Sequence, residues 1–334
     1  LNCVDYLCFG CETDSIDLLN TVAEILINEP KEYKDLLTLN LKTGISFPKA
    51  RAKALDEYFK KYNLDYSLDI NSKKYAKYPS DITSNSNLDI NTFINQPNNI
   101  LGIEYIKALM RFNSKINPVP LKRLGAGYHS LDTRTKLASA TGIRTAMANK
   151  DNISGLLPDN CLNIIKNHTT IEYNDFSTVL GSKLLSMDTL DHIEGINQDL
   201  SNRIANNKYN FTDIETFMPM LQSKNYTYSA ISRALLHIIL DIKTDGLKEF
   251  ISNNYVNYAM ILGFNKNTGV LSEISKSTKI PLVSKFATFY KEADNNQRKM
   301  LDINLKADNL YRMIYMNKTS ETLPTEFQRQ IIIK

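Results

Sequence analysis

Three residues carry groups that could bind a nucleotide, and each stands at the border of a predicted element. Gly10 ends a short apolar run, and a glycine lets a ligand approach the backbone without meeting a Cβ. Asn98 lies at a predicted helix start, where its amide and the unpaired N–H groups could bind a ribose, base or phosphate. Arg123 follows a second apolar run, and a guanidinium suits phosphate oxygens. A turn, a helix cap and a surface charge are the ordinary alternatives.

A second candidate group lies in residues 138–144, which read Ala-Ser-Ala-Thr-Gly-Ile-Arg and lead into a predicted helix. Ser139 and Thr141 bring hydroxyl groups to the helix start, and Arg144 follows one turn later. Such a combination can hold phosphates. The alternative is a plain Ser/Thr cap with an exposed arginine.

Two apolar runs must position the first group. Residues 4–10 and 119–124 are short, apolar and followed by glycine-containing turns, a pattern typical of buried strands. In an α/β sheet, ligands bind at the carboxyl ends of the strands. We therefore expect Gly10, Asn98 and Arg123 to converge on a single nucleotide.

Segments whose apolar residues have helical spacing lie on either side of these runs. Strands that alternate with helices predict an α/β architecture. The polar, aperiodic residues 62–96 predict a long loop or insertion. Because nothing precedes the first strand, we expect the sheet to be incomplete. Helices are expected at residues 16–26, 33–41, 46–59 and 97–109.

The strand signals fade from about residue 150, and the remaining chain predicts helices only. We expect an α/β domain over residues 1–149 and a helical domain over residues 150–334. Ser229 to Leu240 carries the best-formed apolar stripe. The candidate helices cover residues 159–167, 172–185, 195–206, 211–217, 227–242, 268–277 and 284–300.

Composition limits the classes of protein. The 334 residues are 43% hydrophobic and 23% charged, which is typical of globular domains and excludes wholesale disorder. A net charge of +4 is only weak support for a nucleic-acid partner. The four cysteines lack the spacing of a zinc site, so reduced thiols are expected. With neither a long apolar run nor a basic-apolar leader, the sequence favours the cytosol.

Several blocks resemble the bacterial tRNA(Met) cytidine acetate ligases. One block reads Phe-Gly-Cys-Glu at residues 9–12, and another reads Pro-Asn-Asn-Ile-Leu-Gly-Ile-Glu-Tyr at residues 97–105. Residues 138–144 resemble the I-S-S-T-x-I-R motif of nucleotidyltransferases with the HIGH-type fold, with alanine at the first and third positions. All matching blocks lie in order along the chain, at residues 7–12, 41–48, 97–105, 122–129, 232–237 and 262–264.

The resemblance implies an incomplete Rossmann-like sheet of the nucleotidyltransferase type and a helical domain that helps to hold tRNA. The implied reaction converts acetate and ATP into acetyl-adenylate, then acetylates the wobble cytidine of elongator tRNA(Met) to N4-acetylcytidine. The implied ATP contacts fall on Gly10, Asn98, Arg123 and the backbone of Leu124. The implied partners are ATP, acetate and tRNA(Met), and Mg²⁺ is a reasonable companion for ATP. Neither DNA nor a membrane is expected.

One family motif is absent from this sequence. The family's site begins with N-P-F-H-x-G-H, whereas the histidines here are His129, His168, His192 and His237, none of which lies in such a motif. We therefore name no catalytic residue and expect that this chain by itself does not turn over ATP. Two alternatives stay open: a non-catalytic RNA-binding or scaffold protein, and a small-molecule adenylyltransferase of the same fold.

The helical half also contains candidate RNA contacts. Residues 224–228 and Arg233 mix cations with aromatic rings, as a single-stranded RNA surface does, although ordinary helix-start packing fits equally well. His237 is expected to be a buried, hydrogen-bonded histidine, and His129 a structural loop histidine. A basic stretch that could contact tRNA phosphates consists of Lys276, Lys279, Lys285, Lys291, Arg298 and Lys299.

Overall fold

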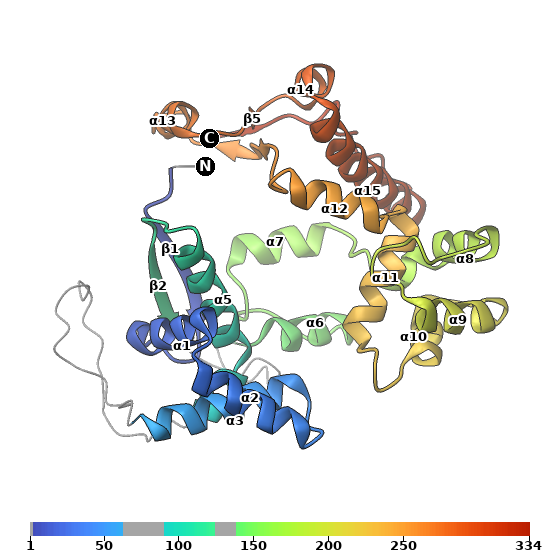
Figure 1. Cartoon of the computed structure of the whole chain (residues 1–334). Coiled ribbons are helices and arrows are strands. Elements are labelled where there is room, and N and C mark those ends of the chain that lie inside the picture. The colour runs from blue at the N-terminus through green and yellow to red at the C-terminus, as the bar shows by residue number, and fades with distance from the viewer. Residues whose placement is uncertain (1–2, 63–89, 124–137) are drawn as a thin grey trace. The chain divides into compact units, whose positions relative to one another are not determined.

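A computed structural model describes residues 3–62, 90–123 and 138–334 (Figure 1). The contacts divide the chain into two compact units, one of Val4–Asp159 and the other formed mainly by Asn160–Lys334. The division lies ten residues beyond the boundary expected after residue 149, at the start of helix α7 (Asp159–Asn167). Within the described residues, no helix is long and apolar enough to cross a membrane.

The first unit contains a pair of parallel strands, with helices α1 and α5 beside it (Figure 1). Strand β1 (Tyr6–Cys11) pairs with β2 (Asn117–Lys122), and Gly10 lies opposite Leu121 in the register. The expected strands are therefore present, each within two residues of its predicted start. The helices of this unit are α1 (Ile16–Asn28), α2 (Lys31–Lys42), α3 (Phe47–Lys61), α4 (Ile90–Asn95), α5 (Pro97–Arg111) and α6 (Ala140–Ala148).

Helices α1 and α5 pack against each other, and α5 also packs on β1. Their contact buries Leu19 and Val22 of α1 with Ile103 and Ile106 of α5, all at most 2% exposed. Removing such side chains from water contributes about 1.5–3 kcal/mol each, so this core fixes where α5 begins relative to the end of β1.

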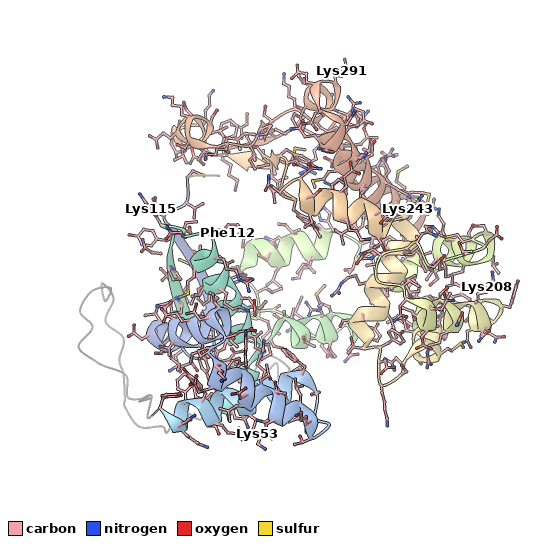
Figure 2. All side chains as sticks on the ribbon, viewed as in Figure 1. Lys53, Phe112, Lys115, Lys208, Lys243 and Lys291 are labelled. Atoms are coloured by element: carbon pink, nitrogen blue, oxygen red, sulfur yellow. The ribbon has the colours of Figure 1, made fainter. Side chains whose placement is uncertain are left out.

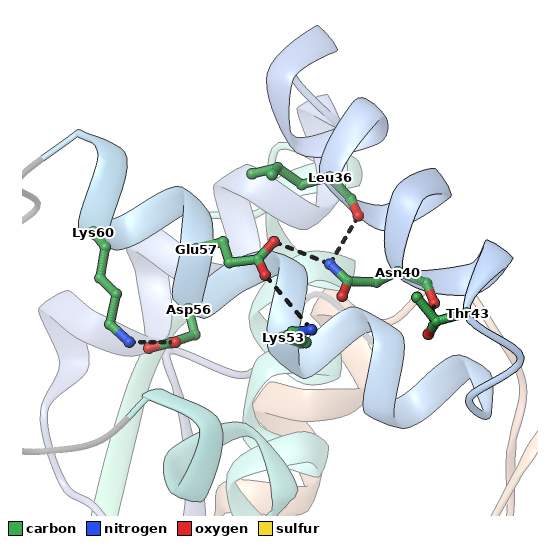
Figure 3. A network of polar contacts seen from close by, with 7 residues as sticks. All are labelled: Leu36, Asn40, Thr43, Lys53, Asp56, Glu57 and Lys60. Atoms are coloured by element: carbon green, nitrogen blue, oxygen red, sulfur yellow. Dashed lines mark hydrogen bonds and ion pairs between the residues drawn. The ribbon is translucent and has the colours of Figure 1, made fainter.

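A polar network joins α2 to α3 (Figure 3). The Nδ2 atom of Asn40, a residue only 2% exposed, donates to the carbonyl oxygen of Leu36 at 2.9 Å and to Glu57 Oε2 at 3.0 Å. The other oxygen of Glu57 lies 3.9 Å from Lys53 Nζ. Because buried polar groups are costly unless paired, this network specifies the packing of the two helices.

The second unit is built mainly from helices around α11 (Tyr228–Leu240), whose buried stripe includes Ile231, Leu235 and Ile238. Two pairs of two-residue parallel strands accompany the helices, β3 (Ala259–Met260) with β5 (Leu282–Val283) and β4 (Gly263–Phe264) with β6 (Ile332–Ile333). The other helices are α8 (Ser177–Ser186), α9 (Gln198–Asn207), α10 (Ile214–Leu221), α12 (Thr244–Ser252), α13 (Val270–Ser277), α14 (Phe286–Glu292) and α15 (Asn295–Thr319), with 3₁₀ turns at Tyr173–Phe176 and Lys208–Asn210.

Several elements differ from the sequence-based expectation. Strands β3 to β6 lie in the part of the chain that was expected to contain helices only, because two-residue strands carry no periodic pattern. The single helix expected over residues 284–300 is two helices, α14 and α15. Helix α4 lies at the end of the segment that was expected to be a loop, where it buries Ile90, Phe93 and Ile94. Helix α12 was not expected, because Gly246 and a polar first turn weaken its pattern. Helix α15 extends to Thr319 rather than ending near residue 300, and few of its 25 residues are buried, so no apolar stripe marks it in the sequence.

Candidate functional site

The strand pair brings Arg123 beside Gly10. The backbone N–H of Arg123 donates to the carbonyl oxygen of Cys11 at 2.8 Å and so continues the ladder by one residue past β2. A Cβ placed on Gly10 would lie 3.5 Å from Cγ of Arg123 and 3.8 Å from its Cδ. The aliphatic part of the arginine therefore lies along the backbone at the carboxyl end of β1.

Asn98 joins this pair from the first turn of α5. Its side-chain Oδ1 accepts a hydrogen bond from Arg123 Nη1 at 3.4 Å, and its Nδ2 donates to Glu12 Oε1 at 2.6 Å. The residue is 9% exposed. Gly10, Asn98 and Arg123, which lie far apart in the sequence, thus meet at the carboxyl ends of two parallel strands, where α/β sheets bind ligands.

Sequence reasoning missed Glu12, whose carboxylate caps α5. Glu12 Oε2 accepts from the backbone N–H of Asn99 at 3.0 Å, and Oε1 also receives the N–H of Asn98 at 3.4 Å. The sequence suggested that the backbone N–H groups at this helix start are open to a ligand. In the structure, those of Asn98 and Asn99 are paired with Glu12. The signal for Glu12 was its place directly after β1, since a carboxylate is stabilised at a helix N-terminus.

The structure also separates Asn98 from its neighbour Asn99. Asn99 is fully buried, and its Oδ1 accepts from the backbone N–H groups of Glu12 at 3.0 Å and Thr13 at 3.1 Å. Its Nδ2 donates to Gln96 Oε1 at 2.7 Å. Asn99 therefore ties the loop after β1 to the start of α5, while Asn98 is the amide that reaches Arg123.

The second candidate group forms the start of α6. Ser139 is the N-cap, 3% exposed, and its Oγ accepts from the N–H of Gly142 at 3.0 Å. Thr141 Oγ1 accepts from Arg144 Nη2 at 3.4 Å on the exposed side of the helix. The Ser139 hydroxyl thus serves as a cap, whereas Thr141 and Arg144 present their polar groups outward. Leu124 and His129 lie outside the described residues.

Cys11 directly follows Gly10 at the end of β1. Burial, followed by the carboxylates of Asp14 and Glu12, raises its pKa to about 11, and its Sγ lies 3.5 Å from the carbonyl oxygen of Leu121. A thiol with such a pKa stays protonated near neutral pH and is a poor nucleophile. The group around Gly10 therefore offers one guanidinium and one oriented amide for binding, not a thiolate.

In the second unit, several candidate RNA contacts have structural partners. His237 Nδ1 donates to the carbonyl oxygen of Glu194 at 2.7 Å, as expected for a structural histidine. Thr227 is the N-cap of α11, and Arg233 is exposed on that helix. Tyr228 keeps 55% of its surface exposed.

The basic stretch is only partly open to solvent. Lys299 Nζ pairs with Glu249 at 2.6 Å, and the guanidinium of Arg298 lies over the ring of Tyr290 at 4.3 Å. Lys276, Lys279 and Lys285 are exposed, and Figure 2 shows Lys291 at the surface of its helix. Lys276, Lys279, Lys285 and Lys291 thus remain exposed at the surface.

These features define an α/β unit with polar side chains gathered at the ends of two parallel strands, followed by a mainly helical unit. A family model described as HIGH Nucleotidyl Transferase matches residues 1–326. The tRNA(Met) cytidine acetate ligase of Clostridium acetobutylicum is 32% identical over 340 residues, covering 100% of this chain and 77% of that protein. The ligase of Halothermothrix orenii is 31% identical over 327 residues, covering 93% and 73%.

A solved structure shares the fold. The Thermotoga maritima TmcAL crystal structure bound with alpha-thio ATP has a TM-score of 0.78 and 24% identity, covering 99% of this chain and 76% of that one. This likeness confirms the predicted fold class. The chain therefore belongs to the HIGH nucleotidyl transferase family and, within it, groups with the tRNA(Met) cytidine acetate ligases.

Proposed function

We propose that this protein acetylates the wobble cytidine of elongator tRNA(Met). Acetate attacks the α-phosphorus of ATP, giving acetyl-adenylate and pyrophosphate. The exocyclic amine of the cytidine then attacks the acetyl carbon, AMP leaves, and the amine loses a proton, giving N4-acetylcytidine. The observation that carries this proposal is the meeting of Gly10, Asn98 and Arg123 at the strand ends.

Each of the three residues has a proposed part in holding ATP. The backbone at Gly10, exposed and without a side chain, would lie against the nucleoside. The Asn98 amide would hydrogen-bond the nucleotide, and the Arg123 guanidinium would face its phosphates. Leu124 would add a backbone contact, and Thr141 and Arg144 further phosphate contacts. Ser139, whose hydroxyl caps α6, would act by shaping that helix start.

Magnesium is proposed to arrive with the nucleotide. Mg²⁺ is usually bound through substrate phosphates, waters and one or two carboxylates. In residues 3–62, 90–123 and 138–334, no three His, Cys, Asp or Glu side chains gather as a metal site. Titrating ATP with and without Mg²⁺ would measure its contribution to binding.

The helical unit is proposed to hold the tRNA. The exposed lysines at positions 276, 279, 285 and 291 suit contacts with the phosphate backbone, which weaken as salt rises. The target cytidine must leave its stack before the amine can reach an adenylate, as other base-modifying enzymes require. Because tRNA is encountered in the cytoplasm, we propose that compartment.

The test combines the full product of the gene with acetate, ATP and a tRNA(Met) transcript, then digests the RNA and measures N4-acetylcytidine by mass spectrometry. Arg123→Ala should lower the modification rate about tenfold or more, because a charge-assisted contact to phosphate is lost. Arg111→Ala, an exposed arginine at the end of α5, is the matched control and should leave the rate unchanged.

Other outcomes would redirect the assignment. Modification that is indifferent to Arg123→Ala would contradict the nucleotide site. Binding of tRNA(Met) without affinity for ATP would favour an RNA-binding scaffold. Binding of ATP without affinity for tRNA would favour a small-molecule adenylyltransferase.

A further inference from the structure

We propose that Glu12 is a positioning residue of the nucleotide site, acting through Asn98. This inference rests on the proposed function and names a residue that the sequence patterns did not single out as part of the site. Glu12 connects with Arg123 through the intervening Asn98 amide, whose two ends bond to the carboxylate and to the guanidinium.

The contacts of the Asn98 amide favour a single orientation of its side chain. An asparagine side chain has one end that accepts hydrogen bonds and one end that donates them. With Nδ2 donating to Glu12 and Oδ1 accepting from Arg123, both ends are satisfied. The flipped amide would place its oxygen against a carboxylate and its NH₂ against a guanidinium. Glu12 and Arg123 therefore select one orientation, which presents Oδ1 to the arginine.

The contacts of the Glu12 side chain require a carboxylate. One oxygen of Glu12 accepts from the Asn98 side chain, and the other accepts from the backbone N–H of Asn99 at 3.0 Å. Both oxygens must therefore be acceptors, which an ionised carboxylate provides and a glutamine amide does not. A glutamine would face one of these two donors with its own NH₂ group.

A positioning role for Glu12 and a simple effect of its charge predict opposite changes in ATP affinity. A negative charge beside a triphosphate site repels the ligand, so removing it would tighten ATP binding if charge were the main contribution. Loss of the orienting hydrogen bonds would weaken binding instead. The sign of the change in affinity therefore distinguishes the two roles.

The experiment is a double-mutant cycle on the full-length protein, with the Kd for ATP measured by calorimetry and the melting temperature by scanning calorimetry. Glu12→Gln should weaken ATP binding about tenfold, since hydrogen bonds to charged groups of this kind are lost. Glu12→Asp keeps the charge but is one methylene shorter, so it should also weaken binding. In the Asn98→Ala background, Glu12→Gln should change the Kd little, because the group through which it acts is gone.

A matched control separates positioning from capping. Asp294 is an acidic cap of α15, and its Oδ1 accepts from the N–H of Gln297 at 2.9 Å. Asp294→Ala removes this acceptor, so it should lower the melting temperature without changing the Kd for ATP. A change in affinity at Glu12 would then not be a general consequence of losing a helix cap.

The outcomes are distinguishable. Unchanged or tighter ATP binding by Glu12→Gln, or additive losses in the cycle, would overturn the role of Glu12 while leaving the nucleotide site in place. A wild-type protein without affinity for ATP would overturn the proposed function and this inference together.

Discussion

The ring of Phe9 fills the space that a side chain on Gly102 would need. A Cβ at Gly102 would lie 2.5 Å from Phe9 Cε2, a distance that real side chains do not tolerate. The ring also meets Tyr105 edge-on, with centroids 5.8 Å apart. This close approach of α5 to β1 brings Asn98, at the start of the helix, to the carboxyl end of the strand.

Gly102→Ala should therefore destabilise the protein although alanine is the better helix former. Overpacking a closed interface costs about 1–3 kcal/mol, which exceeds the gain of about 1 kcal/mol in helix propensity. The free energy of unfolding in urea measures the balance. Gly246→Ala in α12 is the control, because its Cβ would meet no atom within 4 Å and should stabilise the protein. Equal effects of the two substitutions would contradict the packing argument.

Gly10→Ala should leave stability nearly unchanged but weaken ATP binding. The new Cβ would meet Arg123 at 3.5 Å, an ordinary van der Waals contact, so the protein itself can hold it. The methyl group would occupy the exposed backbone at the strand end against which the nucleoside is proposed to lie. Calorimetric titration with ATP measures the loss. An unchanged Kd would show that the nucleotide does not approach this backbone.

Asn40→Asp should destabilise the contact between α2 and α3 by about 3 kcal/mol or more, because it places an unpaired charge in a buried site. The new carboxylate would face Glu57 at 3.0 Å and the carbonyl of Leu36 at 2.9 Å. Thermal unfolding measures the effect. Asn95→Asp is the control, since exposed Asn95 makes the same kind of bond to the carbonyl of Asn91, and its cost should stay below about 1 kcal/mol. Comparable losses would contradict the role assigned to burial.

Alkaline pH should destabilise the protein partly through Cys11. Burial and nearby carboxylates raise the pKa of this thiol from 9.0 to about 11 in the folded state. The unfolded chain therefore releases the proton first, so the stabilisation is complete below pH 9 and is lost as the pH rises toward about 11.

The melting temperature of the wild type should thus fall more steeply above pH 9 than that of Cys11→Ala. Tyr33, whose pKa burial raises to about 12, contributes equally to both proteins, so the difference reports the thiol. Parallel pH profiles would show that the thiol titrates alike in both states.

The sequence by itself determined the elements that have strong local patterns and the site of their convergence. Apolar spacing located α1, α5 and α11, and short apolar runs located β1 and β2. Since parallel strands present their carboxyl ends at one edge, the meeting of Gly10, Asn98 and Arg123 followed from strand order. Segments with weak patterns, such as α4, α12 and the end of α15, were missed because short or mostly exposed helices carry little periodic signal.

Only the tertiary structure decided how those residues are held. Glu12 caps a helix that lies 86 residues away in the sequence, and its place after β1 does not by itself identify that helix as its partner. The same contacts distinguish Asn98, which reaches Arg123, from Asn99, which is buried in the loop. Spacing along the chain determines which face or end a residue occupies, whereas the partner of a polar side chain depends on which distant backbone the core brings within hydrogen-bonding distance.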